Sequence, residues 1–110
     1  MVDARCGAGT ALVATSAMGP YRALVDRAHR LYVDGYSAQA VRASRAWVLV
    51  TAGGADHSST RYLRYVEGIA LQDLGRHREA MTVAMDLLAE LEDEPDLTWR
   101  AKALALLAES

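Results

Sequence analysis

The stretch that decides the fold is Gly68-Ile-Ala-Leu-Gln-Asp-Leu-Gly-Arg-His-Arg-Glu-Ala80, in which a glycine separates two segments of helical pattern. Upstream of Gly75, apolar residues recur at three- and four-residue spacing, as one face of a helix requires. Glycine favours the left-handed conformation that closes a helix, so we expect the first helix to end at Gly75. The helical pattern resumes at about Arg78. The stretch therefore predicts two helices joined by a tight turn.

A weaker copy lies forty residues upstream, Ala28-His-Arg-Leu-Tyr-Val-Asp-Gly-Tyr-Ser-Ala-Gln-Ala40. In both stretches a small residue stands seven positions before the turn glycine and an alanine stands five positions after it. Small side chains on both helices let their backbones approach closely. Gly68 lies inside a helix, where glycine costs about 1 kcal/mol relative to alanine. We therefore expect a further helix to approach closely at Gly68.

The apolar periodicity of the whole chain predicts an all-α fold of about five helices. We expect a flexible N-terminal arm over residues 1–18, helix hairpins over 20–51 and 59–93, and an extra helix over 96–109. The loop between the hairpins is residues 52–58. The expected N-caps are Ser37 for the second helix, Ser58 or Ser59 for the third, and Asp96 for the fifth.

The repeated frame resembles the tetratricopeptide repeat (TPR) family, whose members stack antiparallel helix pairs into a right-handed solenoid. The matching residues are Ala28, Gly35 and Ala40 in one unit, Gly68, Gly75 and Ala80 in the next, then Pro95, Trp99, Ala103 and Leu106. The resemblance covers residues 20–108. The glycines are forty residues apart, whereas the family period is about 34, and Arg64 replaces the usual tryptophan. Another helical-hairpin array or a plain helix bundle remains an alternative.

The resemblance implies that the first helix of each pair lines a concave groove that binds a peptide or protein segment. By position, the groove residues are Arg22, Val25, His29, Tyr32, Tyr62, Tyr65, Ile69, Gln72, Arg100 and Leu104. Aromatic and arginine side chains are the usual anchors of an interface. The tyrosines have a second interpretation, which is packing between the units. Some members grip a terminal carboxylate with Lys and Asn, but those residue types are absent from the matching positions here.

Charge is unevenly distributed along the chain, although the net charge is only −2. Residues 1–64 hold eight arginines and four aspartates, while residues 65–110 hold four basic and ten acidic residues. Two solvated faces explain this division, and so does head-to-tail self-association or a polar partner. The overall charge does not favour nucleic acid or an anionic membrane.

The sequence offers no catalytic or metal-binding motif. His29, His57 and His77 share no metal-ligand spacing with one another or with Cys6. The glycine pairs lack the lysine of a phosphate loop. We therefore expect no cofactor, no metal and no enzymatic activity. The single cysteine fits a reducing compartment, and no apolar run is long enough to span a membrane, so we expect a cytoplasmic protein.

Two functions follow as hypotheses. The first is a non-enzymatic protein-binding module, of the kind that the resemblance associates with bacterial signalling enzymes and regulators. The second is a structural homodimer that assembles through the apolar fifth helix, with Leu104 and Leu107 as contact residues. A repeat array needs a polar cap on its last helix, and the fifth helix is too apolar for that role. We therefore expect either a longer native chain or pairing with a second copy. A small helical enzyme is a third, weaker interpretation.

Overall fold

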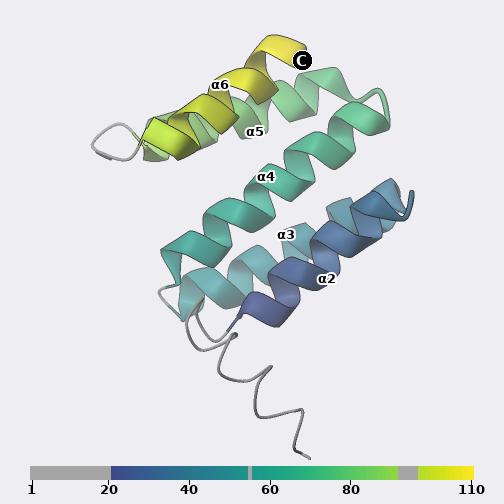
Figure 1. Ribbon diagram of the computed structural model, residues 1–110, viewed down its shortest axis with the longest axis vertical. Coiled ribbons are helices and arrows are strands. Elements are labelled where there is room, and N and C mark those ends of the chain that lie inside the picture. The colour runs from purple at the N-terminus through teal and green to yellow at the C-terminus, as the bar shows by residue number, and fades with distance from the viewer. Residues whose placement is uncertain (1–20, 55, 92–96) are drawn as a thin grey trace, which may run out of the picture.

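The computed structural model describes residues 21–54, 56–91 and 97–110, and all regular secondary structure in this part of the chain is α-helical (Figure 1). Its five helices are α2 (Arg22–Val33), α3 (Ser37–Gly53), α4 (His57–Asp73), α5 (His77–Glu90) and α6 (Leu97–Glu109). The all-α prediction with five helices is confirmed over the described residues. The arm expected over residues 1–18 lies outside them.

The helices form two layers, and α4 is the central helix. In Figure 1, α2, α4 and α6 lie towards the viewer, and α3 and α5 lie behind them. Each helix packs on the next one in the chain, and α4 also packs on α2 and α6. The exposed side of α2, α4 and α6 is called the front face below.

The two turn glycines have the conformation that their positions predict. Gly35 has φ of 93° and Gly75 has φ of 77°, both in the left-handed region. At the first turn the Tyr36 amide donates to the Leu31 carbonyl at 2.8 Å, and at the second the Arg76 amide donates to the Leu71 carbonyl at 2.9 Å. This is the Schellman pattern that closes a helix at a left-handed residue. The two halves of the repeated frame therefore end their first helices in the same way.

The expected caps of the second and third helices are wrong. Asp56 caps α4, because its carboxylate accepts from the Ser59 amide at 3.1 Å and from the Ser59 hydroxyl at 2.8 Å. The helix therefore begins at His57, two residues earlier than expected. Ser37 is the first residue of α3 and caps nothing. Its buried hydroxyl donates instead to the Asp73 carboxylate at 2.5 Å, which ties the start of α3 to the end of α4. Asp96 lies outside the described residues.

Small residues lie where the helices approach most closely. Ala28, Ala40 and Ala80 are fully buried in the core that α2, α3, α4 and α5 share. A Cβ added to Gly68 would lie 2.5 Å from Cδ2 of Leu106 in α6, so Gly68 leaves room for that side chain. A neighbouring helix does contact Gly68, and that helix is α6, which reaches it through the Leu106 side chain. A second core lies between α5 and α6; its members are Ala84, Leu87, Leu91, Ala103 and Leu106.

Candidate functional site

A chain of aromatic and basic side chains crosses the front face from α2 to α6. The guanidinium carbon of Arg22 lies 5.9 Å from the centre of the Tyr62 ring. The Tyr62 ring meets Trp99 edge to face, with centres 5.3 Å apart, and Tyr65 meets Trp99 similarly at 6.1 Å. The Lys102 ammonium lies 5.5 Å from the Tyr65 ring centre and 6.0 Å from that of Trp99. We call Arg22, Tyr62, Tyr65, Trp99 and Lys102 the front-face cluster.

The spacing of these residues explains why they meet. Tyr62 and Tyr65 are three residues apart on α4, and Trp99 and Lys102 are three apart on α6, so each pair shares one side of its helix. Edge-to-face ring pairs contribute about 0.5–1.5 kcal/mol beyond their buried area. All five side chains are only partly buried. The cluster therefore links the front helices and still presents rings and cations to solvent.

A cavity of about 250 Å³ lies beside this cluster. Its lining residues are Arg22 and Val25 from α2, Ser58, Ser59 and Tyr62 from α4, and Thr98, Trp99 and Lys102 from α6. The lining holds two cations and no carboxylate. Arg22 pairs with Asp26 one turn further along α2, at 3.1 Å. Within the described part of the chain, no carboxylate lies within ion-pair distance of Lys102. The lining residues therefore carry a net positive charge, and the carboxylates of Asp26 and Asp56 contact two of them, Arg22 and Ser59.

Tyr65 remains a neutral phenol at physiological pH. Burial raises its pKa above the ordinary value, and the nearby Glu109, Tyr32 and Tyr62 raise it further. A protonated phenol can donate a hydrogen bond to a ligand.

The structure brings part of the expected groove together. Arg22 and Tyr62 line the cavity. Tyr65 does not line it, but its ring contacts two residues that do, Trp99 and Lys102. Val25 also lines the cavity, but only 3% of it is exposed, so it belongs to the core. His29 is exposed, and its ring centre lies 6.5 Å from that of the half-buried Tyr32.

Other expected groove residues hold the helices together. Ile69 packs against the α5–α6 core. The Gln72 amide donates to the Leu106 carbonyl at 2.8 Å and to the Ser110 hydroxyl at 2.9 Å, which fixes the end of α6. The Arg100 guanidinium donates to the Leu91 carbonyl at the end of α5, at 2.9 Å. Gln72 and Arg100 therefore make contacts within the chain.

The two residues expected at a dimer contact differ in exposure. Leu104 is 49% exposed on α6. Leu107 is partly buried and packs against the α5–α6 core. Leu104 alone of the pair presents a large apolar surface.

Reasoning by repeat position missed the α6 residues of the cluster, Trp99 and Lys102. Their three-residue spacing places an aromatic and a cation on one helix side. That spacing groups the two residues but does not show that their side of the helix lies beside α4. Repeat position selected Arg100 and Leu104 instead, which lie on other sides of the helix. The buried Ala103 and Leu106 determine which side of α6 faces α4.

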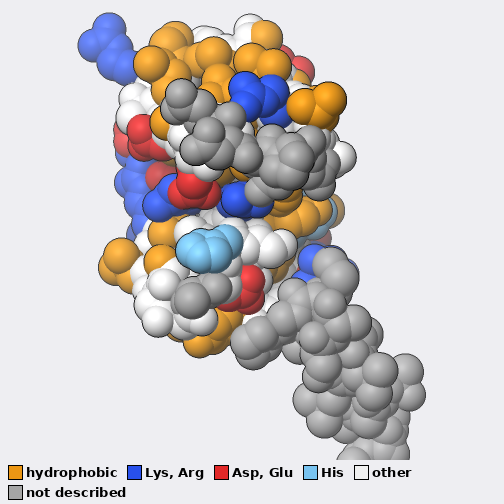
Figure 2. All heavy atoms as spheres, turned by 90° about the vertical axis from the view of Figure 1, so that its left-hand side faces the viewer, with side chains coloured by type: hydrophobic (Ala, Val, Ile, Leu, Met, Phe, Trp, Pro, Cys, Tyr) orange, Lys and Arg blue, Asp and Glu red, His pale blue; other side chains and the backbone are white. Residues whose placement is uncertain are grey.

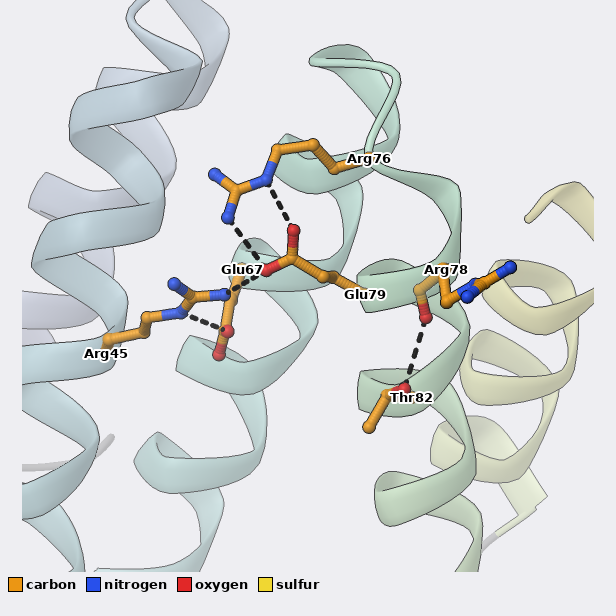
Figure 3. A network of polar contacts seen from close by, with 6 residues as sticks. All are labelled: Arg45, Glu67, Arg76, Arg78, Glu79 and Thr82. Carbon is orange, nitrogen blue, oxygen red and sulfur yellow. Dashed lines mark hydrogen bonds and ion pairs between the residues drawn. The ribbon is translucent and has the colours of Figure 1, made fainter.

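An ion-pair network braces α3, α4 and α5 away from the front-face cluster. Figure 3 shows Arg45 between Glu67, at 2.7 Å, and Glu79, at 3.1 Å. Glu79 also accepts two hydrogen bonds from Arg76, at 2.6 and 2.7 Å. Arg76, and then Arg45, lower the pKa of Glu79. The hydrogen bond to Glu67 raises the pKa of Arg45.

A cavity of about 430 Å³ adjoins this network and is lined by Arg45, Arg64, Glu67, Glu79, Thr82, Val83 and Asp86. Its arginines are already paired, because Arg64 contacts Glu90 at 2.5 Å and Arg45 contacts two glutamates. Figure 2, a side view of the molecule, shows basic and acidic side chains interleaved across its middle, with hydrophobic side chains above and below. Paired ions of this kind are typical of a structural brace.

Among residues 21–54, 56–91 and 97–110, no group of three His, Cys, Asp or Glu side chains could hold a metal ion. None of the helices in these ranges is both long enough and apolar enough to cross a bilayer. Comparison of the chain with protein-family models, curated proteins and solved structures finds no match in any of the three.

Proposed function

We propose that this chain is a non-enzymatic protein-interaction module that binds a peptide or protein segment across its front face. The observation that carries the proposal is the front-face cluster, where partly exposed rings and cations border a cavity of about 250 Å³. Aromatic and arginine side chains beside a pocket are the residues that anchor most interfaces. Rings, hydroxyls and cations in this arrangement suit recognition better than acid–base chemistry.

We further propose that the helices are stacked as TPR-like hairpins, with α2–α3 and α4–α5 as two units and α6 as the first helix of a third. Three observations support this arrangement: the matching turns at Gly35 and Gly75, the buried Ala40 and Ala80, and the packing of Gly68 against α6. In such an array the first helices line the ligand-binding face. The front face consists of those helices.

The test is selection of ligands from a random ten-residue peptide library, followed by fluorescence anisotropy with the enriched peptides. We expect the double variant Tyr32→Ala, Tyr65→Ala to lose binding while its helical circular dichroism is unchanged. The matched control is Tyr36→Ala, because Tyr36 is 55% exposed in the α2–α3 turn. Failure to enrich any peptide, or undiminished binding by the double variant, would contradict the proposal. Unfolding of the double variant would identify these tyrosines as core residues; in that case Lys102→Gln, at a partly exposed cation, replaces it.

A second candidate is a homodimer that assembles through α5 and α6. It is favoured by exposed apolar side chains on these helices, namely Met85 at 56%, Leu97 at 69% and Leu104 at 49%. Light scattering should then report a dimer that Leu104→Glu converts to a monomer. Leu107→Glu is a poorer probe because Leu107 packs on the core. A strictly monomeric wild-type chain would exclude this candidate.

A further inference from the structure

We infer that the front-face cavity holds an acidic side chain of an extended peptide segment, between Arg22 and Lys102. This inference rests on the proposed function and specifies the chemistry of its ligand. The cavity lining carries both cations and no carboxylate. An acidic group is therefore the complementary occupant, because opposite charges across an interface favour the matching partner and disfavour the wrong one.

The two cations differ in how far they are already neutralised. Arg22 shares its charge with Asp26 at 3.1 Å, whereas no described carboxylate lies within ion-pair distance of Lys102. Lys102 also lies close to the Tyr65 and Trp99 rings, which hold its ammonium beside the cavity. We therefore expect Lys102 to contribute more than Arg22 to the preference for an acidic side chain, with Arg22 contributing from α2.

The cavity size indicates that a single side chain enters it. Its volume of about 250 Å³ is below the roughly 300–1,000 Å³ of pockets that enclose a drug-sized ligand. The remainder of a bound segment would lie along the partly exposed rings of Tyr62, Trp99 and Tyr65. Apolar or aromatic residues next to the acidic one would pack on these rings.

The experiment uses three ten-residue peptide libraries with acetylated N-termini and amidated C-termini, fixed at one central position as Glu, Gln or Lys. Because the caps remove the terminal charges, the three libraries differ in charge only at the fixed position. Dye-labelled chain should be retained about fivefold more on the Glu library than on the Gln library, the ratio that an exposed ion pair supports. It should be retained least on the Lys library. Peptides that differ only in the central Glu, Gln or Lys are then titrated into the Trp47→Phe variant. Trp99 is the remaining tryptophan of that variant, so the change in tryptophan fluorescence reports binding at the cavity.

The charge variants decide the assignment. Lys102→Gln should remove most of the Glu-over-Gln preference, and Arg22→Gln should reduce the preference less. The control is Arg42→Gln, because Arg42 lines a different cavity between α2 and α3. The preference should also decrease with added salt.

Each contrary result has a distinct meaning. Equal retention on the Glu and Gln libraries overturns the inference and leaves the proposed function standing. An equal loss with Arg42→Gln overturns it too, because the preference would then follow overall charge. If inorganic phosphate alone produces the full Trp99 response, the cavity is a simple anion site and the inference fails. If no library member binds, both the inference and the proposed function fail.

Discussion

Two buried serine hydroxyls, in Ser44 and Ser37, have opposite effects on the stability of the fold. Ser44 opposes it, because its side chain is fully buried in α3 and its hydroxyl has no hydrogen-bond partner among the described residues. Ser37 favours it, because its buried hydroxyl donates to Asp73. A buried hydroxyl is costly only when it is unpaired, so the two serines should respond oppositely to replacement.

Ser44→Ala should raise the free energy of unfolding by about 1 kcal/mol, because it removes an unpaired buried hydroxyl and improves helix propensity. Ser37→Ala is the matched control and should lower it by about 1 kcal/mol. Urea denaturation followed by circular dichroism measures both. A destabilised Ser44→Ala variant would indicate that this hydroxyl has an unrecognised partner.

Gly75→Ala should lower the free energy of unfolding by about 1–2 kcal/mol, because an L side chain is strained in the left-handed conformation. Nothing lies within 4 Å of a Cβ added at Gly75, so the cost would come from the backbone alone. Gly53 also has open space around it but no positive φ. Gly53→Ala should therefore leave stability unchanged or raise it. Equal effects in thermal melts of the two variants would contradict this explanation.

The helices are joined to their neighbours by steric fit at some contacts and by ion pairs at others. Gly68 in α4 leaves room for Leu106 in α6. Arg45 in α3 contacts Glu67 in α4 and Glu79 in α5. The first contact should be sensitive to side-chain volume and the second to pH.

A double-mutant cycle should reveal the fit between α4 and α6. Leu106→Ala by itself should lower the free energy of unfolding by about 2–5 kcal/mol, as replacement of other buried leucines does. The change in the free energy of unfolding caused by Gly68→Ala should be more favourable by about 1 kcal/mol in the Leu106→Ala background than in the wild type, because the contacting side chain is gone. The measurement is chemical denaturation of the four proteins. Additive effects would show that Leu106 does not limit the space at Gly68.

The brace at Glu79 should make stability depend on pH. Arg76 and Arg45 lower the pKa of Glu79 in the folded state. The unfolded chain therefore binds the proton more tightly, so this contribution is present above the ordinary glutamate pKa and is lost as pH falls through the folded value. Glu79→Gln should destabilise the protein at pH 7, and the difference should disappear in acid. A difference independent of pH, in thermal melts from pH 7 to pH 3, would refute the assignment.

For the described chain taken together, the sequence predicts the helices better than it predicts the candidate site. Gly35 and Gly75 are predictable because a left-handed turn disfavours other residues, and Gly68 because a glycine inside a helix leaves room for a neighbouring side chain. The cap at Asp56 is harder to predict, since Ser58 and Ser59 are adjacent and have equally suitable side chains. The orientation of α6 is hardest, because that helix is apolar around most of its circumference and periodicity cannot select the side that faces α4. The cluster residues Trp99 and Lys102 depend on that orientation.

The division of the core predicts that α6 opens more easily than the central helix α4. Among the described helices, α4 packs on four others, whereas α6 packs on α4 and α5 and leaves Leu97 and Leu104 exposed. Segments with fewer buried contacts open at lower free energy. Amide hydrogens of α6 should therefore exchange faster than those in the middle of α4, as hydrogen exchange with mass spectrometry can measure.

Ligand binding should change this order, because the front-face cavity takes part of its lining from α6. A peptide held between Arg22 and Lys102 contacts the folded α6 and not the opened form, so it should slow exchange in α6 by mass action. Exchange in α3, on the other layer, should change least. If α6 and α4 exchange at the same rate without peptide, the molecule opens as one unit and α6 does not open separately.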